Sequence, residues 1–449
     1  MHVALAIAAA STRASVEMAP SKSPGASSDR PLPTDTYLSE YSKIFDHIGM
    51  LEARSRSQPI SPTAADALHR SRTWPQDMQR MAAYHDAIKR NAAVHFKGKV
   101  VLDVGSGTGV LAIWAAQAGA RRVYAVEASG VGAHIQTMVE AHGLADTVTV
   151  LRERVEQVDV IVSEWMGYFL LRESMVLLAR DRWLKPGGVM YPSHARLLLA
   201  PSALPRFLLR RREEIASSMH AWEQLAAELR SKYSLRLDAL QASTRRPAPR
   251  TPLRPPRPPA ALAPLPPPRR PRRPPPSPPA SQAAYEREHH EYAFSEAWQG
   301  ILPASLLRDE PQVLLEADMH SVTHAQFFDW QTEVQFAPPH ADEPQHGLCG
   351  WFDVRFCGSE SQPAHECVEL DTSPEAPPTH WAQTTLLLER PLDGSPLVVA
   401  LAQNSGFHHD LNVTVSSGAW SASYAVTADF RGGEDFLEDA EAEEGEEGA

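Results

Sequence analysis

Two glutamates nine residues apart give this sequence a pair of carboxylates that could hold a planar cation. Glu164 follows the apolar run 158–162, and Glu173 comes after a turn that contains Gly167. If the run is a strand of a parallel sheet, Glu164 lies at the carboxyl edge of that sheet, where ligands bind. Two carboxylates brought together there can hold the cation through charge-assisted, bidentate hydrogen bonds. Two solvated surface acids are the plain alternative, but the aromatic and apolar residues 165–171 argue against it.

A glycine-rich turn after another apolar run predicts a cofactor site. The run 100–104 carries Asp103 and leads into Gly105 and Gly107, and a helix is expected over 110–118. Glycines at these points let the backbone approach a ligand closely at the start of a helix. The alternative is that they only form a tight turn.

Two further residues specify which cofactor this turn would bind. Val110 stands where a dinucleotide-binding fingerprint requires glycine or alanine, which favours the amino-acid part of S-adenosylmethionine over a pyrophosphate. Glu127 ends the next expected strand, 123–126, where its carboxylate can accept hydrogen bonds from both hydroxyls of a ribose.

The elements that would position these residues alternate between strands and helices in the first half of the chain. Such alternation predicts an α/β fold with a doubly wound parallel sheet. Helices are expected at 36–51, 78–95, 110–118 and 204–233, and strands at 100–104, 123–126 and 158–162. From residue 312 onward short strand-like runs predict a barrel-like, all-β domain. These runs are 313–315, 327–336, 351–356, 384–388, 397–401 and 411–415, with an extended run before them at 196–201.

Taken together, these motifs resemble those of the protein arginine methyltransferases, and the residues around them are most similar to those of plant-type members. Glu164 and Glu173 match the double-E loop of that family, and Thr379-His380-Trp381 matches its THW loop. The segment 37–41 resembles its YFxxY helix, and 179–186 resembles the stretch that leads into its β domain. The likeness covers most of residues 36–200 and 285–415.

The resemblance implies a role for each matching residue. Glu164 and Glu173 hold the substrate guanidinium, while the pair His380–Asp77 helps to remove the proton. The implied cofactor-binding residues are Tyr41, His47, Arg80, Asp103, Gly105, Gly107, Glu127, Val155 and Glu156. The implied substrate-binding residues are Tyr37, Met50, Met175 and Trp381. Arg80 pairs with the cofactor carboxylate, and the two methionines are those of type I members, which make mono- and asymmetric dimethylarginine. No metal is expected.

The domain boundaries combine the composition with this resemblance. Residues 1–34 read as a disordered tail, 35–98 as a helical lid with an insertion at 53–76, and 99–192 as a Rossmann-like cofactor-binding domain. The β-barrel-like domain covers 193–430, with a helical dimerisation arm at about 204–303 that a Pro/Arg-rich segment interrupts at 244–280. Residues 431–449 form an acidic, disordered tail.

Charge and cysteine content suggest a compartment and the kind of partner. The net charge is −12, and an acidic body suits a basic partner such as a histone or a Gly/Arg-rich RNA-binding protein. Cys349, Cys357 and Cys367 are an odd number without metal-site spacing, so we expect reduced thiols and no disulfide. No apolar run approaches the roughly 18 residues that cross a bilayer. The cytoplasm or nucleus is therefore expected, with an organellar transit peptide as the alternative for the acid-poor N-terminus.

The segment 244–280 carries 17 prolines and nine arginines without one acid. It could be a ligand for SH3- or WW-type modules, a contact for RNA, or only a linker. If the insertion at 53–76 displaces the lid, the chain is instead an inactive scaffold that acts through this segment. A small-molecule methyltransferase and an NAD-dependent enzyme are further alternatives, which the double carboxylate and Val110 respectively disfavour.

Overall fold

In a computed structural model of the chain, part of the sequence can be described residue by residue. The described residues are 78–129, 132–150, 157–171, 175–233, 294–339, 345–390, 392–403, 410–418 and 420–426. The contacts divide the chain into two compact units, one of residues 1–207 with 294–449 and one of residues 208–293. Residues 35–77 of the predicted lid, with the insertion at 53–76, and the segment 244–280 lie outside the described residues.

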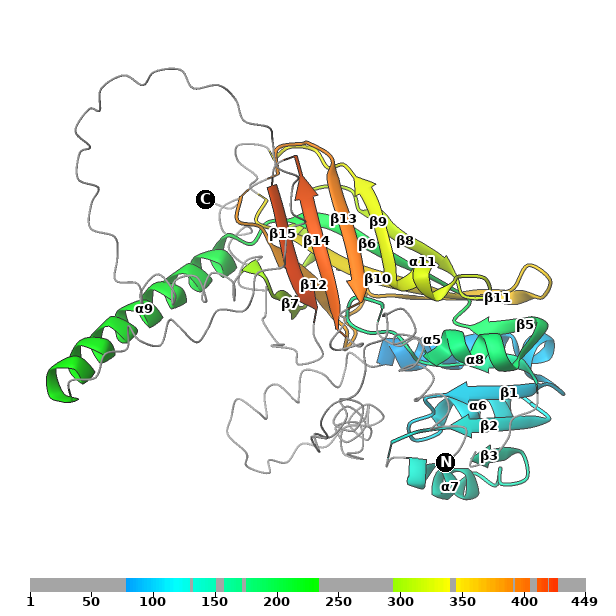
Figure 1. The fold of residues 1–449 in the computed structure, drawn as a ribbon. Helices are drawn as coiled ribbons and strands as arrows, with labels where there is room; N and C mark the ends of the chain where they lie inside the picture. The colour runs from blue at the N-terminus through cyan, green and yellow to red at the C-terminus, as the bar shows by residue number, and fades with distance from the viewer. Residues whose placement is uncertain are drawn as a thin grey trace, which may run out of the picture. The chain divides into compact units, whose positions relative to one another are not determined.

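The first unit contains a parallel sheet of five strands, as the alternating pattern predicts (Figure 1). In spatial order the strands are β3 (Val148–Val150), β2 (Arg122–Val126), β1 (Val100–Val104), β4 (Val158–Val162) and β5 (Leu184–Tyr191). The three expected strands are confirmed, and each is mostly apolar, apart from Asp103 in β1 and Asp159 in β4, because the sheet is covered on both faces. Strand β5 was not predicted, because Pro186, Gly187 and Gly188 disfavour a strand. These residues are tolerated because β5 lies at the edge of the sheet.

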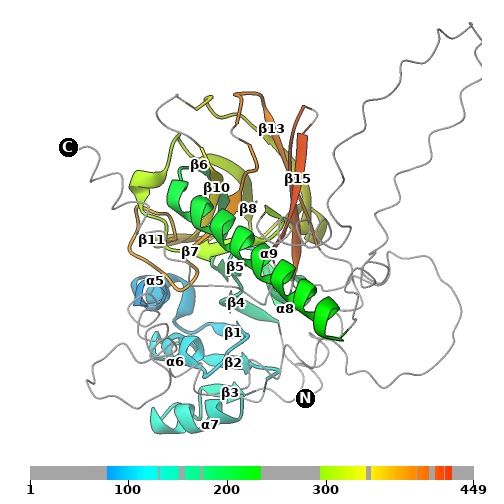
Figure 2. The ribbon, with the colours of Figure 1, turned by 90° about the vertical axis from the view of Figure 1, so that its left-hand side faces the viewer.

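Helices lie on both faces of this sheet, with α6 (Val110–Gln117) on one side and α8 (Met175–Trp183) on the other (Figure 2). Helix α7 (Gly132–Ala141) packs near β3. The helix expected over 78–95 ends early: α5 covers Met78–Arg90, and the π-helix η2 covers Ala92–Phe96. The change turns His95 inward, where its Nδ1 lies 2.7 Å from the hydroxyl of Tyr191.

The second half of the first unit consists of two antiparallel sheets. One has the order β7 (Ala297–Gly300), β12 (Gln383–Leu387), β10 (Gly347–Gly358), β6 (His194–Ser202) and β8 (Gln312–Asp318), with β11 (Pro363–Asp371) also paired to β10. The other has the order β15 (Trp420–Val426), β14 (Leu411–Ser417), β13 (Leu397–Gln403) and β9 (Asp329–Val334). Their edges meet twice: Thr332 donates to the Leu314 carbonyl at 2.9 Å, and Ala425 N donates to Ser295 O at 2.7 Å. This joining of edges gives the barrel-like arrangement that was predicted.

Three expectations for this half are wrong. The run 327–336 is not a strand throughout, because Thr323 and Gln326 form a capping box that starts helix α11 (His324–Phe328) ahead of β9. Residues 297–300 were expected in the helical arm but form β7, which pairs with β12 and buries Trp298 and Gln299. Cys357 and Cys367 were expected as free thiols but form a disulfide, because the β10–β11 hairpin brings them face to face.

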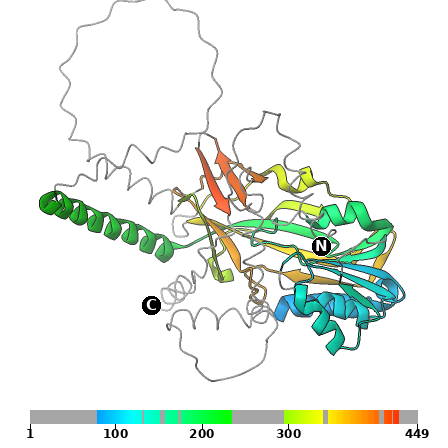
Figure 3. The ribbon, with the colours of Figure 1, turned by 60° about the horizontal axis from the view of Figure 1, so that its bottom comes forward.

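The second unit contains α9 (Pro205–Tyr233), which begins in the first unit and confirms the helix expected over 204–233. It runs as one continuous helix (Figure 3). Leu209 and Leu225 on this helix are 55% and 46% exposed. Within the described part of the chain, no helix combines the length and apolar character needed to cross a membrane.

Gly350 in β10 must be a glycine because the ring of Phe169 lies against its backbone. A Cβ atom at this position would stand 2.4 Å from Cε2 of Phe169, which is buried in the loop after Glu164. We expect Gly350→Ala to destabilise the protein by about 1–3 kcal/mol through overpacking. It should also slow catalysis, since the displaced ring belongs to the loop that carries Glu164. Thermal melting and the turnover rate measure the two effects.

The double variant Gly350→Ala/Phe169→Leu is the matched control for this prediction. Shortening Phe169 makes room for the new methyl group, so the two changes together should cost less than their sum. A Gly350→Ala protein that melts at the parent temperature would show that the ring moves aside freely.

Candidate active site

The glycine-rich turn connects β1 to α6, as the motif predicts. Gly105, Gly107 and Gly109 have φ values of 73°, 54° and 88°, a left-handed conformation that side chains rarely adopt. A Cβ atom added to Gly105 would meet no atom within 4 Å. The backbone of the turn therefore faces open space, in which a ligand can lie directly against it.

Asp103 is completely buried beneath this turn. Its Oδ2 accepts a hydrogen bond from the backbone N–H of Ala112 at 2.9 Å, while its Oδ1 is buried with no hydrogen-bond partner among the described residues. Burial raises the pKa of Asp103 to about 7, and the negative charge of Glu127 contributes to the rise. An unsatisfied buried acceptor of this kind fits a ligand that brings a donor, such as the amino group of an amino acid.

Glu127 follows β2 and lies against the same turn. Its Oε2 accepts a hydrogen bond from Gly107 N at 2.8 Å, and its Oε1 accepts one from Ser129 N at 2.7 Å. Each carboxylate oxygen has a second lone pair. The two oxygens are thus fixed in place and can still accept the hydroxyl groups of a ribose.

The raised pKa of Asp103 predicts a pH dependence of stability. Below its ordinary value of 3.8 the carboxyl group is protonated in both the folded and unfolded states and costs nothing. As pH rises from about 4 to about 7 the unfolded state releases this proton and the folded state retains it, so stability is lost. Relative to Asp103→Asn, we expect the parent to lose up to about 1.4 kcal/mol of unfolding free energy per pH unit in that window. Urea titrations of both proteins without cofactor would measure this, and parallel pH profiles would contradict it.

Glu164 follows β4, at the carboxyl edge of the sheet where it was predicted. Its Oε2 lies 3.0 Å from Nη1 of Arg80, which comes from the first turn of α5, and both side chains are mostly buried. Cζ of Arg80 also lies 5.8 Å from the ring centroid of Trp381. A guanidinium group is thus held between the carboxylate of Glu164 and the indole of Trp381. Arg80 was predicted to bind the cofactor carboxylate; in the structure it pairs with Glu164.

Tyr84, which was not predicted as a site residue, supports the backbone just before Glu164. It lies one helical turn after Arg80 in α5, and its hydroxyl donates to the carbonyl of Ser163 at 2.9 Å. Burial, followed by the charge of Glu164, raises the pKa of Tyr84 well above its usual value. The i, i+4 spacing from Arg80 is the signal that could have identified it.

The THW loop reaches the same place from the β domain. Trp381 donates from Nε1 to the carbonyl of Met166 at 3.1 Å, and Thr384 donates to the carbonyl of Tyr168 at 3.3 Å. The ring of His380 lies 3.9 Å from the ring of Trp381, centroid to centroid. The loop after Glu164 and the THW loop, more than 200 residues apart in the sequence, therefore pack against each other. Together with α5 they bring Arg80, Glu164, His380 and Trp381 close to one another.

The remaining predicted site residues divide into two groups. Met175 begins α8 and packs, partly buried, against the core. The others lie outside the described residues: Tyr37, Tyr41, His47, Met50, Asp77, Val155, Glu156 and Glu173. Across the described ranges, no group of three or more His, Cys, Asp or Glu side chains is placed to hold a metal ion.

Comparison with known proteins places this arrangement in a family. Residues 76–236 match a methyltransferase domain, and residues 289–417 match the arginine methyltransferase oligomerization subdomain. The rice (Oryza sativa subsp. japonica) protein arginine N-methyltransferase PRMT10 is 40% identical over 330 residues, 70% of this chain and 74% of the relative. The chain belongs to the protein arginine N-methyltransferase family.

Other relatives support this membership. The Arabidopsis thaliana PRMT10 sequence is 35% identical over 336 residues, which are 73% of this chain and 76% of that protein. The crystal structure of Arabidopsis thaliana protein arginine methyltransferase 10, described as uniquely open, superimposes with a TM-score of 0.66 at 29% identity. It covers 86% of this chain and 99% of that one. A Trypanosoma brucei PRMT1 enzyme–prozyme complex with AdoHcy gives a TM-score of 0.59 at 25% identity, covering 86% of this chain and 100% of that one.

The methyl donor of this methyltransferase is S-adenosylmethionine, and the residues of the turn fit it. The unsatisfied Oδ1 of Asp103 suits the amino group of its methionine part, and the open space at Gly105 leaves room beside the backbone. Glu127 is placed to take the ribose hydroxyls. The resemblance to the family is thereby confirmed for the fold and the cofactor.

Proposed function

We propose that this methyltransferase transfers methyl groups to the guanidinium nitrogens of arginine side chains in other proteins, giving mono- and asymmetric dimethylarginine. One observation carries the proposal: a guanidinium group, that of Arg80, already lies 3.0 Å from Glu164 and over the ring of Trp381. A neutral acceptor would need neither a buried carboxylate nor an aromatic face for a cation.

The chemistry assigned to the chain is mainly orientation. When bound, S-adenosylmethionine supplies an electrophilic methyl group on its sulfonium. Glu164 holds the substrate guanidinium by a charge-assisted hydrogen bond and draws its positive charge to one side, which leaves the opposite nitrogen more nucleophilic. Glu173 is the predicted second carboxylate. The released proton passes to a carboxylate or to His380, for which Asp77 is the predicted partner.

The substrate guanidinium and Arg80 cannot both occupy the place beside Glu164 and Trp381. We therefore infer that Arg80 turns toward the carboxylate of the bound cofactor, the role predicted for it, before the substrate enters. The proposed substrates are basic proteins such as histones and Gly/Arg-rich RNA-binding proteins, because the net charge of −12 favours a basic partner. The proposed compartment is accordingly the cytoplasm or nucleus.

The type I product is proposed because Met50 and Met175 match the methionines of family members that make asymmetric dimethylarginine. Met175 begins α8 and is partly buried against the core.

A homodimer is part of the proposal. A second copy that packs on one face of helix α9 would cover either Leu209 or Leu225, which lie on nearly opposite faces of the helix. The match of residues 289–417 to an oligomerization subdomain supports this arrangement. The segment 244–280 is proposed to bind SH3- or WW-type modules, on the strength of its proline and arginine content alone.

The deciding experiment uses methyl-labelled S-adenosylmethionine with histones and a Gly/Arg-rich peptide, followed by mass spectrometry of the arginines. Asymmetric dimethylarginine supports the whole proposal, whereas symmetric dimethylarginine overturns the product type alone. Cofactor binding without methyl transfer would favour the alternative, an impaired scaffold that acts through the segment 244–280.

A further inference from the structure

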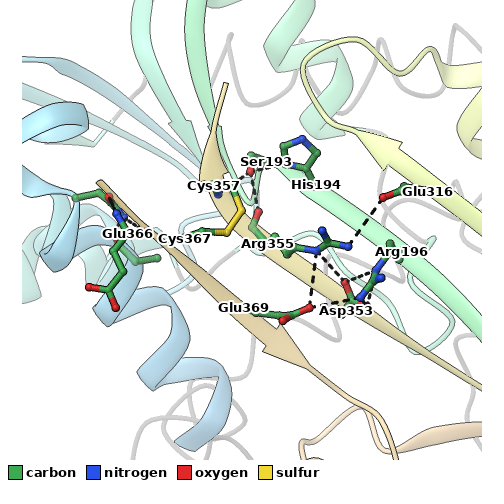
Figure 4. The surroundings of a disulfide bond; sticks show 12 residues. Ser193, His194, Arg196, Glu316, Asp353, Arg355, Cys357, Glu366, Cys367 and Glu369 are labelled. Atoms are coloured by element: carbon green, nitrogen blue, oxygen red, sulfur yellow. Dashed lines mark hydrogen bonds and ion pairs between the residues drawn. A yellow bond between two sulfur atoms is a disulfide. The ribbon is translucent and has the colours of Figure 1, made fainter. Parts of the chain in front are cut away.

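The disulfide between Cys357 and Cys367 lies in the β10–β11 hairpin (Figure 4). The Cα atoms are 4.3 Å apart, at the point where the register of the two strands shifts. Cys367 is exposed and Cys357 is half-buried, so small thiols in solution can reach the pair. The third cysteine, Cys349, is completely buried and free.

The strand that carries Cys357, β10, contacts the point where the chain passes from the parallel sheet to the barrel-like sheets. The backbone N–H of Cys357 donates to Oγ of Ser193 at 2.9 Å. Ser193 lies between β5 of the parallel sheet and β6 of the barrel, and its own N–H donates to Arg355 O at 2.8 Å. One strand of the hairpin is therefore fixed to the point where the chain passes from one domain to the other.

The half that carries Cys367 contacts the end of α5. Glu366, the adjacent residue, exchanges two hydrogen bonds with Asn91: Asn91 Nδ2 donates to Glu366 O at 2.8 Å, and Glu366 N donates to Asn91 Oδ1 at 3.0 Å. Arg90 adds an ion pair with the Glu366 carboxylate. Helix α5 carries Arg80 and Tyr84 into the active site, so β11 supports the helix that positions them.

Strand β11 pairs regularly with β10 only at the end away from the disulfide, where residues 368–371 lie opposite residues 353–356 and Leu370 is buried. It is an edge strand whose one partner among the described strands is β10, and their register shifts near Cys357. Glu369 of β11 makes long ion pairs with two arginines of the neighbouring strands, Arg196 at 3.5 Å and Arg355 at 3.7 Å (Figure 4). Glu369 is half-exposed, and such pairs contribute little to stability. The disulfide is the covalent connection at the irregular end of this pairing, next to Glu366, the residue that contacts α5.

We propose that Cys357 and Cys367 form a reversible redox site whose state sets how firmly β11 holds α5. Glutathione disulfide is the oxidant. The Cys367 thiolate attacks one of its sulfurs, the S–S bond breaks, and one glutathione leaves and takes up a proton. The Cys357 thiolate then attacks the Cys367 sulfur and releases the second glutathione. The two protein thiols lose two electrons and two protons, and glutathione disulfide becomes two thiols.

The test uses the full chain without any variant in its first step. The protein is equilibrated in mixtures running from reduced to oxidised glutathione, the free thiols are alkylated, and the peptides that contain residues 357 and 367 are weighed. Hydrogen exchange of residues 78–91 is recorded at the two ends of the series. We expect one disulfide to form, exchange in α5 to be at least about threefold slower in the oxidised protein, and Tm to fall by about 2–6 °C on reduction.

Two variants separate this pair from general effects of reduction. Cys367→Ser should melt and exchange like the reduced parent at every glutathione ratio, whereas Cys349→Ala should respond as the parent does. Two alkylated thiols at positions 357 and 367 under fully oxidising conditions would overturn the proposal, as would identical α5 exchange in both states. None of these measurements depends on methyl transfer, so they stand apart from a test of the enzymatic activity.

Discussion

Glu164→Gln is expected to lower kcat for arginine methylation by about 10²–10³-fold and to leave the dissociation constant of the cofactor nearly unchanged. Glutamine keeps the size of the side chain and its hydrogen bond from Met166 N, but it removes the negative charge that lies 3.0 Å from a guanidinium group. Loss of a preorganised electrostatic contact at a reacting group costs about this much. Initial rates with a Gly/Arg-rich peptide, beside calorimetric titration of the cofactor product, measure the two quantities.

A charge-matched control distinguishes this effect from a general change in net charge. Glu333→Gln removes the same charge from an exposed position on β9, far along the chain from the catalytic loop. It should leave kcat within about twofold of the parent, because an exposed charge interacts weakly through water. Equal losses in the two variants, or parental activity in Glu164→Gln, would remove Glu164 from the role assigned to it.

Trp381→Ala is expected to destabilise the protein by about 3–5 kcal/mol and to abolish most of its activity. The indole is 2% exposed, packs against Phe352 and His380, and donates to the carbonyl of Met166. Its removal leaves a large cavity and a buried carbonyl without its donor. The loop that carries Glu164 would then lose its connection to the β domain. Chemical unfolding and peptide kinetics measure both losses.

Trp381→Phe separates the two contributions. It retains most of the buried area but lacks the N–H, so its stability loss should be smaller, while kcat still falls by about 3–10-fold as the loop loosens. Trp420→Ala, in β15, is the matched control that loses an indole away from the catalytic loops. Parental kcat in Trp381→Phe would mean that packing alone holds the loop.

Much of the cofactor half was predictable because its signals are local. Asp103, Gly105 and Glu127 act through residues close in sequence, and a strand, a tight turn and a helix follow directly from the pattern of the chain. The first strands of the parallel sheet were predictable for the same reason, since burial on both faces requires continuous apolar runs.

The misjudged elements are those in which tertiary contacts outweigh local preference. Strand β5 forms through residues 186–188, which disfavour a strand, because it pairs with β4. Residues 297–300 become a strand because β12 offers them a partner. The disulfide was unexpected because ten residues of sequence separation say nothing about whether two strands form a hairpin in that register.

The sequence by itself determined the family, the cofactor turn and the identity of the residues that face the guanidinium. Only the tertiary structure decided how they meet: Arg80 against Glu164, Tyr84 under Ser163, and Trp381 against Met166. These contacts join residues 79 to 215 positions apart. The reason is physical, because the positions of such residues depend on how sheets and helices pack along their buried faces, and no local pattern records that packing.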